Sequence, residues 1–180
     1  MTKRTVMARG GKSATKTTGG PSGNRVPGRV RFLVCVDRRP QSRVAVRYAC
    51  WRARNTGGTV SLLHVIEPPE FQHWAAVGDV MDAERREEAG NLLDDLSLEV
   101  NDWAGVRPAL LVRVGEIGEE ILAAVKEDSD IDVLVVGAAE PGDRRFSLIT
   151  FLAEKLLGHL RVPLVVVPGN LTDEQISNMT

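Results

Sequence analysis

Five short runs of apolar residues recur along the chain, separated by longer and more polar stretches. They cover residues 30–37, 59–66, 107–114, 133–136 and 162–168. The fourth run is wholly apolar and is followed at once by Gly137. Short continuous apolar runs of this kind are typical of strands that are buried on both faces, as in a parallel sheet. The pattern therefore predicts five strands of one sheet.

The stretches between these runs carry apolar residues at helical spacing. Pro40 suits the first turn of a helix that ends before Gly57 and Gly58. A long amphipathic helix is predicted over residues 82–103, a third helix from Ile117, and a fourth from Phe146. Strands that alternate with helices predict an α/β fold, an open five-stranded parallel sheet with helices on both faces.

The two ends of the chain lack this pattern. Residues 1–28 carry six basic side chains and no acidic one, and they are rich in glycine, serine and threonine. We expect a disordered basic tail there, although an organelle transit peptide or a weak contact with anionic surfaces would fit the same composition. Residues 170–180 are polar, and we expect them to form a flexible tail. One folded domain is therefore predicted over residues 29–169.

The last predicted strand has prolines at both ends. Pro163 and Pro168 have no backbone N–H to donate to a neighbouring strand, which places residues 163–168 at or near a sheet edge. Three consecutive valines on an open edge would favour aggregation unless they are covered. We therefore expect a homodimer through this edge strand, and Val165→Asp is expected to break it.

Composition narrows the classes of function. With 43% hydrophobic and 26% charged residues, the chain is typical of a globular protein, and no apolar run is long enough to cross a bilayer. Outside the tail the net charge is −7, so nucleic acid is an unlikely partner of the folded domain. Cys35 and Cys50 have no CxxC spacing, and we expect buried, reduced thiols. A cytoplasmic protein without membrane attachment is predicted.

Catalytic and metal-binding patterns are not found. His64, His73 and His159 are far apart and have no metal-ligand spacing, and we expect His64 to bond nearby backbone. Ser147 is not in a G-x-S-x-G turn, so nothing favours a nucleophile. The sequence predicts neither a metal site nor an enzyme.

Several segments taken together resemble the universal stress protein family over residues 30–168. They are FLVCVD at 32–37, LLHV at 62–65, Gly115, DIDVLVVG at 130–137 and RVPLVVVP at 161–168. The resemblance implies a Rossmann-like sheet with strand order 3-2-1-4-5, a dimer through the last strand, and a cytoplasmic role in stress tolerance.

The resemblance also implies a candidate adenine-nucleotide site at the carboxyl ends of strands one and four. There Val36, Val65 and Val136 would line an adenine slot beside Gly137, and Asp37 would hold the nucleotide. Asp37 could instead cap the following helix or fix its loop. Both interpretations of Asp37 remain open at this point.

The phosphate loop of the family has the form G-x2-G-x9-G-(S/T) after strand four. Gly137 matches the first glycine, but Glu140, Thr150 and Phe151 occupy the next three positions, and Gly142 could supply only a displaced turn. Glycines let the backbone approach phosphates closely, whereas a carboxylate repels them. We therefore expect no ATP binding of the family kind.

Arginines near the site leave an alternative open. They are Arg38, Arg39, Arg144 and Arg145, which could hold phosphate or pair with nearby carboxylates such as Glu67. The sequence thus favours a dimeric stress protein without a cofactor that acts on unknown protein partners. The alternative is a stress sensor that binds ATP or another adenine nucleotide beside Asp37 and Gly137.

Overall fold

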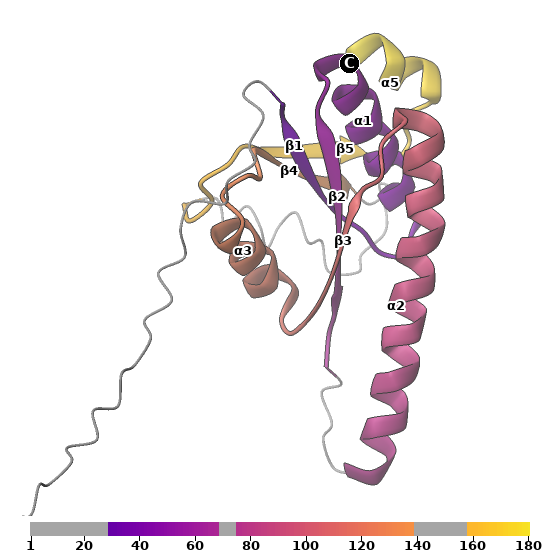
Figure 1. The fold of residues 1–180 in the computed structure, drawn as a ribbon, viewed down its shortest axis with the longest axis vertical. Coiled ribbons are helices and arrows are strands. Elements are labelled where there is room, and N and C mark those ends of the chain that lie inside the picture. Colours follow the sequence, from indigo (N-terminus) through magenta and orange to yellow (C-terminus); the bar gives the residue numbers. More distant parts are fainter. Residues whose placement is uncertain (1–28, 69–74, 139–157) are drawn as a thin grey trace, which may run out of the picture.

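The computed structural model describes residues 29–68, 75–138 and 158–180 (Figure 1). Its core is a sheet of five parallel strands in the order β3-β2-β1-β4-β5. This confirms the predicted fold class and strand order. The strands are β1 (Arg31–Cys35), β2 (Thr59–Ile66), β3 (Ala109–Val114), β4 (Val133–Ala138) and β5 (Leu164–Pro168).

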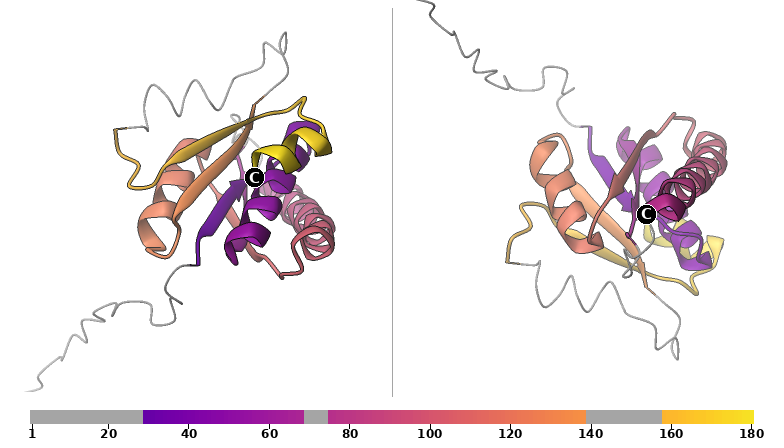
Figure 2. Two further views of the ribbon diagram at one scale, coloured as in Figure 1. Left: turned by 90° about the horizontal axis from the view of Figure 1, so that it is seen from above. Right: turned by 90° about the horizontal axis from the view of Figure 1, so that it is seen from below.

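Helices lie on both faces of the sheet, as predicted. They are α1 (Pro40–Thr56), α2 (Ala75–Ala104), α3 (Ile117–Glu127) and α5 (Asp173–Met179). Figure 2 shows α1 and α2 on one face and α3 on the other. Helix α2 begins seven residues earlier than predicted, because Gly78 does not interrupt it. The predicted helix from Phe146 lies outside the described residues, and no helix within them is long and apolar enough to span a membrane.

Alternation along the strands divides the core into two layers. Leu33 and Leu134 face α3, whereas Val34 and Val135 face α1 and α2, and all four are fully buried. Because both faces are covered, β4 has no polar residue and β1 has only Arg31 at its start, which is why these strands stand out in the sequence. The rigid sheet fixes where each strand ends, and thereby where loop residues can form a site.

Helix α1 begins and ends where its sequence predicts. Pro40 occupies the first turn, and Gly57 follows the last turn with a φ of 64°. This left-handed conformation costs glycine little, since it has no Cβ. The position of Pro40 immediately after the β1 loop brings the start of α1 close to the carboxyl edge of the sheet.

The carboxyl-terminal segment differs from the expectation of a flexible tail. It forms α5, where the Thr172 side chain accepts a hydrogen bond from the Gln175 N–H and the Gln175 side chain accepts one from the Thr172 N–H. Ile176 is fully buried, and Asp173 forms an ion pair with Arg47 of α1. A reciprocal cap and one buried apolar side chain stabilise a helix too short to show a periodic pattern.

Strands β3 and β5 form the two edges of the sheet, so the edge position predicted from Pro163 and Pro168 is confirmed. In β5, Val166 is 40% exposed, whereas Val165 packs partly against the core beneath α1. In β3, Val112 is exposed to a similar degree, at 44%. Val166 is therefore the valine whose substitution tests the edge without disturbing the core.

Candidate functional site

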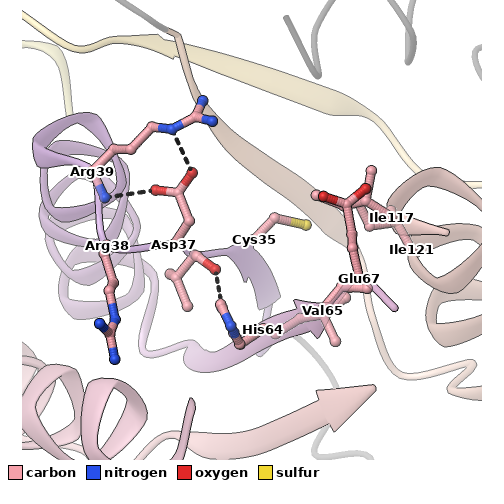
Figure 3. Close-up of a pocket in the computed structure, with 11 residues that line it drawn as sticks. Cys35, Asp37, Arg38, Arg39, His64, Val65, Glu67, Ile117 and Ile121 are labelled. Atoms are coloured by element: carbon pink, nitrogen blue, oxygen red, sulfur yellow. Dashed lines mark hydrogen bonds and ion pairs between the residues drawn. The ribbon is translucent and has the colours of Figure 1, made fainter. Parts of the chain in front are cut away.

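A pocket of about 350 Å³ opens at the carboxyl edge of the sheet, where β1 and β2 end beside the first turns of α3 (Figure 3). The carboxyl ends of parallel strands are where α/β proteins commonly bind ligands. Apolar side chains form the wall of this pocket and charged or polar ones its rim. The wall contains Cys35, Val36, Leu63, Val65, Ile117 and Ile121, and the rim contains Asp37, Arg38, Arg39, His64 and Glu67.

Asp37 fixes the turn between β1 and α1. Its Oδ1 accepts hydrogen bonds from the Arg39 backbone N–H at 2.9 Å and from the Ser42 hydroxyl at 2.6 Å. The Asp37 N–H donates in turn to the Ser42 Oγ at 3.0 Å. Ser42 is buried, so its hydroxyl is held in place, and its bonds with the more exposed Asp37 hold the turn. The loop-fixing interpretation of Asp37 is therefore confirmed, and its Oδ2 lies 3.4 Å from the Arg39 guanidinium.

Both arginines at the rim form ion pairs. Arg39 pairs with Asp37, and Arg38 pairs with Glu88 of α2 at 3.2 Å. Glu67 lines the opposite side of the mouth in Figure 3, and among the described residues nothing pairs with it. The four charged residues of the rim sum to zero, but because Glu88 pairs with Arg38, Glu67 is left without an ion-pair partner among the described residues.

His64 forms a hydrogen bond with nearby backbone, as the sequence predicts. Its Nδ1 lies 2.8 Å from the carbonyl oxygen of Val36, across the gap between β2 and the end of β1. The Val36 N–H donates to the Leu63 carbonyl at 2.9 Å. Both the N–H and the carbonyl of Val36 are therefore hydrogen-bonded to β2. The bond fixes the imidazole ring at the rim.

Gly137 is required by packing. A Cβ added to it would lie 2.4 Å from the backbone oxygen of Gln41, in the first turn of α1. Gly169, just after β5, is crowded by the same residue. Close approach of a helix to a strand is thus sufficient to explain a glycine at position 137.

The predicted site residues are brought together only in part. Val36, Asp37 and Val65 line the pocket. Val136 is fully buried in the layer under α3 and is not among the residues that line the pocket. Gly137 faces α1, and Gly142 lies outside the described residues.

Sequence reasoning missed the α3 side of the pocket. The sequence predicts a helix from Ile117 and a possible ion pair of Glu67 with the arginines, but not that these residues line a pocket. Gly115, directly after β3, indicates where that strand ends. Because parallel strands end at the same edge of the sheet, the start of α3 must lie at the edge where the pocket opens.

Both cysteine thiols of the chain are unsuited to nucleophilic chemistry. Burial raises the pKa of the Cys35 thiol to about 12, and it raises that of Cys50 to about 12 as well. Both cysteines are free, as predicted, and remain protonated at neutral pH. Within the described part of the chain, no cluster of histidine, cysteine and carboxylate side chains could hold a metal ion.

Comparison with known proteins agrees with the fold and with the resemblance. A model of the universal stress protein family matches residues 29–168. No curated protein sequence matches the chain.

Solved structures of similar fold include universal stress proteins from several organisms. UspA from Lactobacillus plantarum has a TM-score of 0.65 and 19% identity, over 77% of this chain and 97% of that one. A family protein from Arabidopsis thaliana with AMP bound has a TM-score of 0.54 and 18% identity, over 81% and 94%. A universal stress protein in complex with cAMP has a TM-score of 0.52 and 16% identity, over 79% and 99%. At these identities the likeness shows the fold.

Proposed function

Because the chain belongs to the universal stress protein family, we propose that it is a non-catalytic, cytoplasmic stress-response protein that acts through contacts with other proteins. In this proposal it does not bind ATP in the manner of the family. The observation that carries the proposal is the charge pattern of the pocket rim, where Glu67 is uncompensated and both arginines are paired among the described residues.

A triphosphate needs positive charge or free backbone N–H groups that point at it. To supply charge here, Arg38 would have to leave Glu88, and Arg39 would have to leave Asp37. The glycine at 137 is already explained by its packing against α1. In the sequence, Glu140 replaces the second glycine of the family loop and adds a further negative charge. These features all argue against a triphosphate at this edge.

Mg-ATP is expected to leave the melting temperature of the full chain unchanged. By mass action, a ligand at 100 times its dissociation constant would stabilise the native state by about 2.7 kcal/mol. For a domain of this size that corresponds to a rise of about 5 °C or more. Differential scanning calorimetry with and without millimolar Mg-ATP makes the comparison, and a saturable rise would refute the proposal.

The second candidate function is an adenine-nucleotide sensor. Two observations favour it: the pocket lies beside Asp37, and proteins of the same fold have been solved with AMP and with cAMP. The same calorimetric series with AMP and cAMP separates the two candidates. Stabilisation by either nucleotide that Asp37→Asn abolishes would establish the sensor.

We also propose that the chain forms a homodimer through β5. This strand lies at a sheet edge and carries the exposed Val166, and pairing or packing two such edges would cover it. Contacts with other proteins would then use surfaces away from this edge.

Val166→Asp is expected to convert the dimer to a monomer, because it places a charge in the centre of the proposed interface. Sedimentation velocity measures the change in mass. Val112→Asp is the matched control, since Val112 is a similarly exposed valine on the opposite edge strand. A dimer that survives Val166→Asp, or that Val112→Asp disrupts instead, would exclude β5 as the interface.

A further inference from the structure

The edge strand β3 presents open backbone groups together with exposed apolar side chains. We propose that this edge binds an extended segment of a partner protein, in which apolar residues alternate with basic ones, as an added strand of the sheet. The inference rests on the proposed function, in which the chain acts through contacts with other proteins, and it names the surface and the kind of partner.

The hydrogen bonds to β2 determine which backbone groups of β3 are open. The Gly115 N–H donates to the Ile66 carbonyl oxygen at 3.1 Å, and Ile66 is the register partner of Val114. Backbone groups of successive residues point alternately to the two sides of a strand, so those of Leu110, Val112 and Val114 point away from β2. Because β3 ends the sheet on that side, another chain can pair with this row.

The side chains of the same three residues form an apolar strip. Leu110, Val112 and Val114 are between 42% and 48% exposed. Leu111 packs in the layer under α3, so alternation places the strip on the opposite face of the strand, where α2 covers it only in part. An added strand with apolar side chains on that face would cover the strip through cross-strand pairs.

The α3 face of the same strand carries surplus negative charge. The Arg113 guanidinium is shared by two carboxylates, those of Glu120 at 3.3 Å and Glu127. Glu116 and Glu119, at the start of α3, are exposed as well. Side chains of an added strand that point to this face would lie beside these carboxylates. Basic residues at alternate positions therefore fit the α3 face, and apolar residues fit the other.

Helix α2 adds negative charge beside the apolar strip. Of its basic residues with a described side chain, Arg85 pairs with Asp82, and Arg86 has no ion pair with another described residue. Five exposed carboxylates of the helix also have no ion pair within the described part of the chain: Glu84, Glu87, Asp94, Asp95 and Asp102. Two copies of β3 paired with each other would bring these like charges together. Charge complementarity thus favours a basic partner over a second copy of this chain.

Fluorescence anisotropy of the full chain with a labelled peptide of alternating lysine and valine tests the inference. The control peptide has glutamate at every lysine position, and we expect it to bind at least tenfold more weakly at low ionic strength. Val112→Pro removes an N–H that points away from β2, which an edge strand tolerates, and it should weaken the lysine peptide at least tenfold. Val166→Pro makes the matching change on the opposite edge strand and should leave the affinity within twofold.

Val112→Lys is a second variant that keeps the backbone N–H and repels the lysine peptide. It should also weaken binding at least tenfold, and melting temperatures verify that each variant is folded. Hydrogen exchange followed by NMR locates the bound peptide. In the free chain the amides of Leu110, Val112 and Val114 should exchange rapidly, and saturating lysine peptide should slow all three at least tenfold.

The outcomes separate this inference from the proposed function. Equal affinity for the two peptides refutes the selection by charge, and equal effects of Val112→Pro and Val166→Pro refute β3 as the site. Slow exchange of the three amides without peptide would mean that this chain or a second copy already covers the edge, which overturns the inference. If no peptide binds and Mg-ATP has no effect, only this inference is wrong. If the lysine peptide binds as expected but Mg-ATP stabilises the chain, only the proposed loss of ATP binding is wrong.

Discussion

Gly137→Ala is expected to lower the free energy of unfolding by about 3 kcal/mol in the absence of any ligand, since overpacking of a tight contact costs on this order. The added Cβ would lie 2.4 Å from the Gln41 backbone oxygen, which cannot rotate away as a side chain could. Relief requires that α1 shift away from β4. Urea denaturation followed by circular dichroism measures the loss.

Gly90→Ala is the control for this experiment. Gly90 lies within α2, and a Cβ added there meets nothing within 4 Å outside its own helix. Alanine in a helix interior is favoured over glycine by roughly 0.5–1 kcal/mol, so this variant should gain stability. If Gly137→Ala is as stable as the wild type, packing against α1 does not explain the glycine, and a role in binding a ligand becomes the better explanation.

Leu134→Ala is expected to lower the free energy of unfolding by about 3 kcal/mol, within the range of 2–5 kcal/mol for buried leucines. Leu134 is fully buried in the centre of β4, and it packs in the layer under α3 together with Leu33 and Ile121. Truncation leaves a cavity that the surrounding strands cannot close. The same urea titration detects the loss as a lower midpoint with an unchanged slope.

Leu98→Ala provides the comparison for Leu134→Ala. Leu98 lies on α2 and is 68% exposed, so its truncation should change stability by less than about 0.5 kcal/mol. Similar losses for the two variants would mean that the assignment of the α3 layer as core is wrong.

The fold was predictable because its strands are buried on both faces. Residues such as Leu33, Leu62 and Val135 are fully buried, and the continuous apolar runs around them are a strong local signal. The ends of α1 were equally predictable, because Pro40 fixes φ at a value that suits a first turn and Gly57 readily takes the left-handed conformation that ends the helix. Strand order came from the resemblance, since the pattern of one strand does not identify its neighbour.

Only the site residues that lie at the carboxyl ends of strands could be predicted from the sequence. Val36, Asp37 and Val65 sit at the carboxyl ends of β1 and β2, and sheet geometry must bring them together. The ion pair between Arg38 and Glu88 joins residues that are 50 positions apart, and only the packing of α2 creates it. The resemblance placed Val136 in the adenine slot, but Val136 is fully buried beneath α3 and does not line the pocket.

The short helix α5 shows what a periodicity analysis overlooks. Seven residues with one buried apolar side chain give no repeating pattern. The spacing of Thr172 and Gln175 was nevertheless readable as a capping box.

This helix bears on how the protein should be handled. The Arg52 guanidinium donates a hydrogen bond to the carbonyl of Thr180 at 3.3 Å, and the fully buried Ile176 anchors the turn before it. A purification tag fused directly after Thr180 would crowd this attachment and loosen α5 from α1. A tag placed ahead of Met1 would leave the same contacts intact, and it is the arrangement to use for the calorimetric and hydrodynamic experiments.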